Sequence, residues 1–368
     1  MANINNGIDK IIIVDPGKNT VNALCFDPSF TLIGHVAFPS ITKKKRSFRD
    51  IDSSSDLQFQ YERNDTKFVV GEGVLGGFDF QTSKNTMHHK VCVETAIAYF
   101  IGDEEEHVHL VVGYPSSDFT NPEQQKAYID LLTESEPVHL KVNGVDKSYS
   151  LVDVVVKPEG IAMKPRVDQI GKDRVKVIDI GGENINYRYY DEKGNTLENE
   201  SLDKLGVNHL ESFLKTRLRK YVKVDDFDLN SVDYMRSVRI GRIDGLKDRD
   251  ITDFKNSTEF IHETVLDFTD MIIEGLDAKG VSLYKRGATI LFTGGGSILL
   301  RKYLEETLEN TKEHLVFSNT AYWDNCISYA IKDVGDRYRY ADGDIMENMQ
   351  MAQMISNKML KEANKLSI

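Results

Sequence analysis

A strand–turn–strand segment occurs twice in this chain, and this repeat most limits what the chain can fold into. Residues 10–26, KIIIVDPGKNTVNALCF, contain a β-branched run, a turn with Asp15 and Gly17, and a second apolar run. Adding 164 to these two positions gives Asp179 and Gly181, which close another β-branched run. Such runs around Gly and Pro predict β-hairpins. Three further pairs share the offset: Val21 with Ile185, Asn22 with Asn186, and Asp27 with Asp191. A repeat at one offset indicates two similar domains, each opening with a hairpin.

Each turn suits a phosphorylated ligand. Gly17 in the first turn, and Gly181 and Gly182 in the second, allow backbone N–H groups to point into one concavity that binds anions. An aspartate at a strand end repels phosphate, but it can bind hydrated Mg²⁺, which prefers one or two carboxylates, water and phosphate oxygens. Two facing hairpins would therefore clamp a nucleoside triphosphate between the domains. The alternative is a pair of ordinary hairpins with Asp in turn positions.

A third motif is a strand that runs into three glycines and then a helix. It has the sequence ILFTGGGSILLRKYL at residues 290–304. Glycine allows the backbone to approach a ring or phosphate closely, and the helix N-terminus adds partial positive charge. The alternative is a tight strand-to-helix turn. Residues 71–76, GEGVLG, match GxGxxG, but no helix start follows them, so we expect an ordinary loop.

Composition narrows the class of protein. The 368 residues include 46 Lys and Arg against 58 Asp and Glu, a net charge of −12. Because phosphate backbones need a basic surface, we expect no direct nucleic-acid partner. The three cysteines lie far apart without a CxxC pair, the first residues contain neither a basic n-region nor an apolar h-region, and no apolar run approaches a membrane span. We therefore expect a cytoplasmic protein of about two domains.

The three motifs, in this order, resemble the phosphate and adenosine loops of the actin-like ATPase superfamily. The segments VKPEG at 156–160, SLDKLGV at 201–207 and NTAYWDN at 319–325 resemble the ParM group of plasmid-segregation actins. The resemblance covers roughly residues 10–35, 65–120 and 150–332. It implies an α/β fold of the actin-like, ribonuclease H-like class: a duplicated two-domain ATPase with the nucleotide in the interdomain cleft. Domain I would span residues 1–172, with an insertion at about 37–85, and be completed by 320–368; domain II would span 173–319.

The resemblance also implies roles for individual residues. Asp15 and Asp179 would bind Mg²⁺ through water, and Glu159 would orient the attacking water and accept its proton. Lys215, on a predicted helix over residues 203–221, is assigned to the sugar side of the nucleotide. The remaining nucleotide-binding positions are Gly17, Lys18, Asn19, Thr20, Asn22, Gly181, Gly182, Glu183, Asn184, Gly294, Gly295, Gly296 and Ser297.

Three positions depart from the family pattern. Lys18 stands where Ser or Thr is usual, and Asn22 where Lys or Gln is usual, so Lys18 is expected to reach the β- and γ-phosphates instead. Glu183 replaces a small hydroxyl residue, and its carboxylate would repel the γ-phosphate unless Lys18 or Mg²⁺ neutralises it.

The function implied is that of a bacterial actin homologue that polymerises with ATP, or alternatively GTP, and Mg²⁺. Its filaments would segregate plasmid DNA through a DNA-binding adaptor of the ParR type, and ATP hydrolysis would control disassembly. One alternative is a sugar-type kinase of the same superfamily, with Asp118 as a candidate catalytic residue. Another is a scaffold that binds nucleotide without turnover, as Glu183 suggests.

Two further segments carry predictions. Residues 42–66 are polar, include the basic run Lys43–Arg46, and are expected to form a loop or a small insertion. Residues 342–365 are expected to form a Met-rich helix docked on the first domain, with a partner surface as the alternative. The apolar row predicted for this helix is Ile345, Met349, Ala352, Ile355 and Met359.

Overall fold

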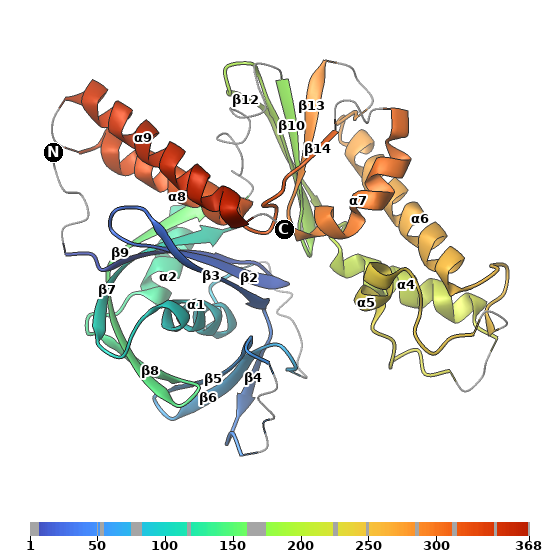
Figure 1. Ribbon diagram of the computed structural model, residues 1–368, viewed down its shortest axis with the longest axis horizontal. Helices are drawn as coiled ribbons and strands as arrows, with labels where there is room; N and C mark the ends of the chain where they lie inside the picture. The colour runs from blue at the N-terminus through green and yellow to red at the C-terminus, as the bar shows by residue number, and fades with distance from the viewer. Residues whose placement is uncertain are drawn as a thin grey trace. The chain divides into compact units, whose positions relative to one another are not determined.

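The computed structural model divides the chain into two units (Figure 1). Unit 1 comprises Met1–Arg166 and Tyr322–Ile368, and unit 2 comprises Val167–Ala321. The structure describes residues 7–49, 51, 55–74, 83–115, 119–159, 174–223, 227–247, 250–283, 287–310, 315–341 and 344–366. Asp118 therefore lies outside the described residues, as do Leu75 and Gly76 of the GxGxxG segment.

Unit 1 is built on a nine-stranded sheet in the order β3-β2-β1-β7-β9-β8-β5-β6-β4. β1 pairs antiparallel with β2 and parallel with β7. The strands are β1 (Lys10–Pro16), β2 (Thr20–Phe26), β3 (Leu32–Pro39), β4 (Thr42–Lys45), β5 (Gln58–Arg63), β6 (Thr66–Gly71), β7 (Glu105–Tyr114), β8 (Val138–Val142) and β9 (Val145–Pro158). The helices are α1 (Met87–Phe100), α2 (Pro122–Leu132), α8 (Asp324–Arg339), α9 (Ile345–Ala363) and the 3₁₀ turn η3 (Asn364–Leu366).

Both faces of the first hairpin are buried, which explains its continuous apolar runs. Side chains alternate across a strand, so neighbouring residues enter different cores. Ile11 and Ile13 pack in one core with residues of α8 and α9, whereas Ile12 and Val14 pack in the other with residues of α1. The hairpin is thus held between two layers of helices.

Unit 2 repeats this plan on a five-stranded sheet in the order β12-β11-β10-β13-β14. The bounds of β10 and β11 are those of β1 and β2 plus 164, and β10 pairs antiparallel with β11 and parallel with β13, as β1 does with β2 and β7. The strands are β10 (Arg174–Ile180), β11 (Asn184–Tyr190), β12 (Thr196–Asp203), β13 (Ala288–Thr293) and β14 (Leu315–Phe317). The helices are α4 (Asn208–Tyr221), α5 (Tyr234–Ile240), α6 (Ser257–Ala278) and α7 (Gly295–Thr307).

The polar segment at residues 42–66 was wrongly predicted as a loop. Thr42–Lys45 forms β4 and Gln58–Arg63 forms β5, and both pair with β6. β4 lies at the edge of the sheet, where Lys43 and Lys44 are exposed. Charged residues on an edge strand oppose pairing with other chains. A run of lysines, which is typical of a solvated loop, can therefore form a strand at this edge.

The C-terminal helix α9 packs on unit 1 as predicted, but through only part of the predicted row. Ala352, Ile355 and Met359 are buried with residues of β1 and β2. Ile345 and Met349 are 66% and 58% exposed. The apolar contact therefore belongs to the C-terminal half of the helix.

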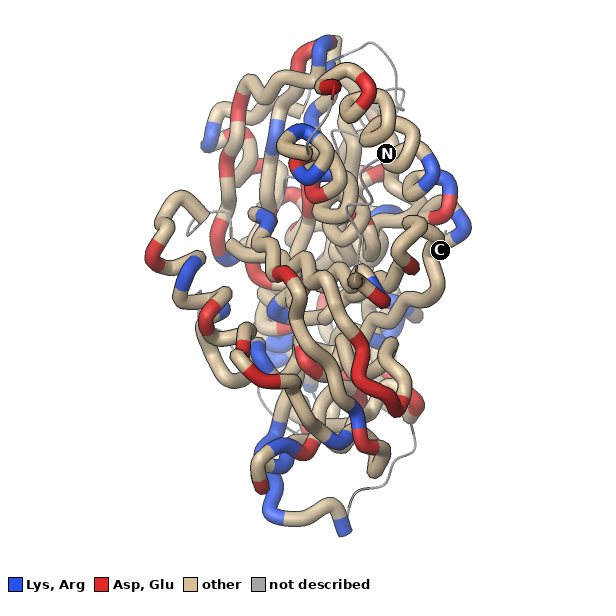
Figure 2. Tube along the Cα trace, turned by 90° about the vertical axis from the view of Figure 1, so that its left-hand side faces the viewer, with Lys and Arg blue, Asp and Glu red and all other residues tan. Residues whose placement is uncertain are grey.

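Basic and acidic residues are interspersed along the described chain (Figure 2). The cysteines Cys25, Cys92 and Cys326 are all buried and form no disulfide. Among the described residues, no helix is both long enough and apolar enough to cross a membrane.

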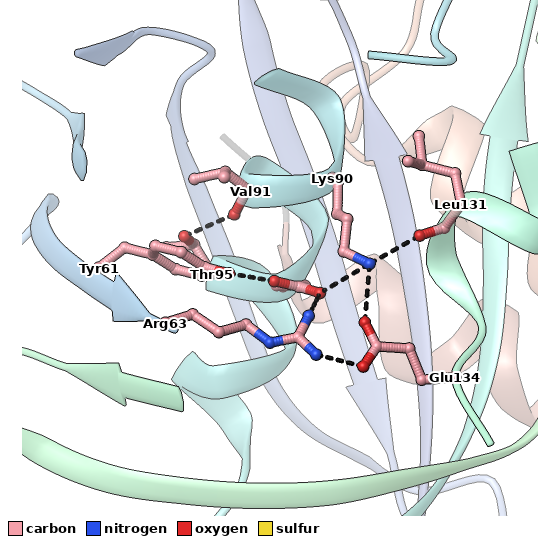
Figure 3. A network of polar contacts seen from close by, with 8 residues as sticks. Tyr61, Arg63, Lys90, Val91, Thr95, Leu131 and Glu134 are labelled. Atoms are coloured by element: carbon pink, nitrogen blue, oxygen red, sulfur yellow. Dashed lines mark hydrogen bonds and ion pairs between the residues drawn. The ribbon is translucent and has the colours of Figure 1, made fainter. Parts of the chain in front are cut away.

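A buried network of charged groups joins α1 to β5 and to the end of α2 (Figure 3). Glu94 on α1 accepts from the Tyr61 hydroxyl, and its Oε1 accepts from Arg63 Nη1 at 2.5 Å. Lys90 donates to Glu134 at 3.0 Å and to the carbonyl of Leu131 at 2.7 Å. Arg63 also bonds Glu134, so two cations neutralise two carboxylates within the fold.

A second buried network joins α8 to β7 and β9. His109 is fully buried; its Nε2 lies 2.9 Å from Asp333 Oδ2, and its Nδ1 lies 3.4 Å from Asp153 Oδ2. Burial alone lowers the pKa of His109, but the hydrogen bonds to Asp153 and Asp333 outweigh burial and raise it. Lys157 joins this network through Asp333 at 3.8 Å and also pairs with Asp336 at 3.1 Å.

Candidate functional site

The first turn, residues 17–19, lies between β1 and β2 and leaves two backbone donors open. Gly17 N–H donates to Asp15 O at 2.9 Å. A Cβ on Gly17 would lie 2.6 Å from Thr20 O, so the tight turn requires glycine. Within the described part of the chain, the N–H groups of Lys18 and Asn19 have no acceptor. Two adjacent open N–H groups form an anion nest.

Asp15, at the end of β1, is enclosed by side chains of α8. It is 6% exposed, and its Oδ2 accepts from Asn325 Nδ2 at 3.0 Å. The Tyr329 hydroxyl lies 3.5 Å from Oδ1. Burial raises the pKa of Asp15 to about 6; the charge of Lys84 opposes this rise, and that of Glu159 adds to it. Asp15 is thus a desolvated carboxyl group in a charged environment.

Two amide oxygens accompany this carboxylate. Asn22 pairs with Asp15 across the hairpin, and Asn325 donates to it. Among the described residues, neither Asn22 Oδ1 nor Asn325 Oδ1 has a hydrogen-bond partner, although both are buried. Buried oxygens of this kind generally bind a partner.

Glu159, predicted to orient water, lies in the same unit and is bound by a lysine. Its N–H donates to Tyr114 O at 2.8 Å, which continues the pairing of β9 with β7. Its Oε1 forms an ion pair with Lys84, whose side chain is 1% exposed. Burial lowers the pKa of the neighbouring His89 to about 2, and the charges of Lys84 and Lys18 contribute.

The second turn, residues 181–183, is clamped from one side by the loop before α4. The N–H groups of Gly206, Val207 and Asn208 donate to Glu183 O, Gly181 O and Gly182 O at 3.1, 3.0 and 2.8 Å. A Cβ on Gly206 would lie 2.3 Å from Gly182 O, so this contact requires glycine. The N–H groups of Gly182 and Glu183 have no acceptor within the described regions, as at Lys18 and Asn19.

The three-glycine segment lies against this second turn. Gly294 has φ +80° and ψ 157°, a conformation restricted to glycine, and a Cβ there would lie 2.3 Å from Asp179 Oδ1. A Cβ on Gly296 would lie 2.5 Å from Ile180 Cγ2. Helix α7 starts at Gly295, so its first N–H groups have no partner within the helix. Ser297, by contrast, bonds back to Gly294 O through both N–H and Oγ.

Two other predicted residues have side-chain partners of their own. Glu183 Oε1 lies 3.2 Å from His209 Nε2, so a histidine of the same unit is its observed partner. Asn184 continues the turn: its carbonyl accepts from Gly181 N–H at 3.0 Å. Lys215 donates to Asn230 Oδ1 at 2.8 Å, and its assignment to the nucleotide sugar stays a prediction.

Sequence reasoning missed Lys84, Tyr329 and His209. Lys84 lies in a polar segment with no motif, and its partner Glu159 is 75 residues away. Tyr329 reaches Asp15 across 314 residues. A local pattern could not signal either contact, although Asn325 belongs to the NTAYWDN segment that carried part of the resemblance.

Part of the chain resembles a known protein family. Residues 14–161 match the N-terminal domain family of actin-like proteins. A search of curated protein sequences found no significant match.

Solved structures match over most of the chain. A ParM filament from Clostridium botulinum, described as 15-stranded, has a TM-score of 0.64 at 17% identity, covering 88% of this chain and 98% of that one. Ta0583, an archaeal actin homolog, has a TM-score of 0.65 at 15% identity, covering 89% and 99%. Its complex with ADP has a TM-score of 0.63 at 16% identity, with the same coverage. The predicted fold class is confirmed: the chain has the actin-like fold, and its residues 14–161 match the N-terminal domain family of actin-like proteins.

Proposed function

We propose that this chain binds and hydrolyses ATP, with GTP as the alternative, and assembles into filaments that segregate plasmid DNA. The observation that carries the proposal is the repeated turn. Each copy has an aspartate at the strand end and two adjacent N–H groups without an acceptor among the described residues. Open N–H groups suit phosphate oxygens, and the aspartates suit the accompanying cation. The actin-like fold and the ADP complex of Ta0583 support a nucleotide as the ligand.

The residues around Asp15 fit Mg²⁺. The ion prefers oxygen ligands and keeps several waters. Asp15 supplies a carboxylate, and the partnerless oxygens of Asn22 and Asn325 supply acceptors for bound water. No group of three or more His, Cys, Asp or Glu among the described residues could cage a metal, which fits an ion retained by few carboxylates. When bound, Mg²⁺ would neutralise phosphate charge; Asp179 would contribute from the second turn.

Glu159 is proposed to act on the attacking water. The water oxygen forms a bond to the terminal phosphorus, the bond from that phosphorus to the bridging oxygen breaks, and the diphosphate leaves with the electron pair. The water proton passes to the Glu159 carboxylate. The firm backbone position of Glu159, bonded to Tyr114, supports a positioning role.

Assembly and DNA segregation rest on the comparisons and the charge. The ParM structure is described as a filament, and head-to-tail contacts between copies give open filaments. With a net charge of −12 and basic residues dispersed among acidic ones (Figure 2), the chain is proposed to reach DNA through a basic adaptor of the ParR type. The setting would be the cytoplasm.

The test combines 90° light scattering, pelleting and phosphate release, with ATP, GTP, ADP or no nucleotide. We expect the wild-type chain to scatter and pellet with triphosphate only. Asp15→Asn and Asp179→Asn should abolish this assembly, whereas Asp103→Asn, at a side chain 84% exposed, should retain it. Glu159→Gln should slow phosphate release and leave assembly intact.

Two experimental outcomes would contradict the proposal and favour one of the alternative functions. Phosphate transfer stimulated by a sugar, without assembly in any nucleotide, would favour the kinase alternative. Nucleotide binding and assembly without phosphate release would favour a scaffold, with Glu183 and its partner His209 as the first residues to examine.

A further inference from the structure

Lys84 is a buried cation close to the proposed phosphate position. It lies three residues before α1, its side chain is 1% exposed, and its Nζ donates to Glu159 Oε1. Removing an ammonium group from water costs several kcal/mol unless a charged partner compensates. Glu159 supplies that compensation.

The pairing conflicts with the role proposed for Glu159. The backbone of Glu159 is fixed by its bond to Tyr114 O, so only its side chain can respond. A carboxylate oxygen that accepts a charge-assisted hydrogen bond from Lys84 is less available to a water molecule. The Glu159 side chain is 19% exposed, so it remains partly accessible.

A second cation converges on the same region. Lys18 belongs to the first turn, whose Asn19 O accepts from Ser40 N–H at 2.9 Å, and Ser40 Oγ lies 3.2 Å from His88 Nε2, four residues beyond Lys84. The charges of Lys18 and Lys84 also both lower the pKa of the buried His89. The open N–H groups of Lys18 and Asn19 lie in that turn. An anion bound there would therefore approach two lysines, only one of which is paired with Glu159.

We propose that Lys84 exchanges partners: its bond to Glu159 gives way to a bond to the terminal phosphate when a triphosphate binds. This inference rests on the proposed function. A terminal phosphate carries more negative charge than one carboxylate and competes for the ammonium group. The exchange frees Glu159 for water only when a third phosphate is present, so Lys84 distinguishes triphosphate from diphosphate.

The proposed exchange predicts that substitutions of Lys84 and of Glu159 change the affinity for an ATP analogue in opposite directions. Lys84→Met should weaken binding of a non-hydrolysable ATP analogue at least tenfold and change ADP binding less than threefold. Glu159→Gln should strengthen analogue binding several-fold, because Lys84 no longer has a competing carboxylate, while phosphate release slows. Lys84→Arg keeps the cation and should restore discrimination between the two nucleotides.

The experiment uses the full chain and fluorescently labelled ADP and ATP analogue, with circular dichroism to verify folding. Urea unfolding without nucleotide measures Lys84→Met, Glu159→Gln and the double variant; the double variant should lose less than the sum of the single losses. Lys90→Met is the matched control, since Lys90 is a similarly enclosed lysine paired with Glu134. It should lower stability and leave nucleotide discrimination unchanged.

The outcomes separate the two proposals. If the wild-type chain binds neither nucleotide, both proposals fail. If it binds both, but Lys84→Met weakens ADP and the analogue equally, or Glu159→Gln weakens the analogue, then Lys84 does not exchange partners and only this inference fails. Additive urea losses would likewise overturn the pairing.

Discussion

The close approach of Gly294 to Asp179 gives the sharpest test of the second site. A Cβ at residue 294 would lie 2.3 Å from Asp179 Oδ1 and 2.5 Å from Ile180 O, distances that real Cβ atoms do not show. Gly280 provides a matched control in the same unit: it has the same φ, +80°, but nothing lies within 4 Å of a Cβ built there. Comparing Gly294→Ala with Gly280→Ala therefore shows what the crowding and the ψ of 157° at Gly294 add to the strain of a positive φ alone.

The expected losses of unfolding free energy follow from backbone strain and steric overlap. Alanine at positive φ costs about 1–3 kcal/mol, and this term applies to both variants. Overlap in a packed region adds about 1–3 kcal/mol more, and only Gly294→Ala has it. We expect Gly294→Ala to lower the free energy of unfolding by about 2–6 kcal/mol and Gly280→Ala by about 1–3 kcal/mol.

Urea unfolding and titration with labelled nucleotide measure the two effects separately. Because Asp179 or the α7 N-terminus must move to admit the Cβ, Gly294→Ala should also lose nucleotide affinity at least tenfold at a temperature where it is folded. Gly280→Ala should bind like the wild-type chain. Equal unfolding losses in the two variants would refute the steric reasoning, and unchanged affinity in Gly294→Ala would refute the placement of the site.

Three further predictions concern the buried networks and the second turn. The raised pKa of His109 stabilises the fold fully below pH 6.5, and this contribution is lost as pH rises through the folded-state pKa. His109→Gln should therefore flatten the decline of unfolding free energy above pH 6.5, by up to about 1.4 kcal/mol per pH unit; parallel urea profiles would contradict this. Tyr61→Phe removes a donor to buried Glu94 and should cost about 1–3 kcal/mol in urea unfolding; a loss below about 0.5 kcal/mol would count against the network. Gly206→Ala, whose Cβ would meet Gly182 O, should weaken nucleotide binding in a titration; wild-type affinity would show that the turn tolerates the shift.

The two hairpins were predictable because their signals are local. Each hairpin consists of a short apolar run, a turn and a second apolar run. The first and last residues of β10 and β11 are those of β1 and β2 plus 164. The glycine segment at the start of α7 was also predictable, since a buried strand, three glycines and an amphipathic run are contiguous. Local patterns suffice where the contacts that stabilise an element lie within it.

The strands β4 and β5 and the partners of Asp15 were not predictable for the opposite reason. β4 is a run of lysines after Thr42, and its strand conformation depends on pairing with β6 more than 20 residues later. Asn325 reaches Asp15 across 310 residues. Such contacts depend on the order of strands in the sheet and on the return of α8 to unit 1. A short stretch of sequence carries no information about either.

Side chains surround the aspartate of the first hairpin, whereas a glycine backbone approaches the aspartate of the second. Asp15 is surrounded by polar side chains, namely Asn325 and Tyr329, and lies within the influence of Lys84 and Glu159. Asp179 is approached by backbone, because Gly294 lacks the side chain that would exclude it. Truncating side chains should therefore damage the first site, and adding a Cβ should damage the second. In the proposed hydrolysis, unit 1 would therefore supply Glu159 and its partner Lys84, whereas unit 2 would supply close backbone contact to the nucleotide at Gly294.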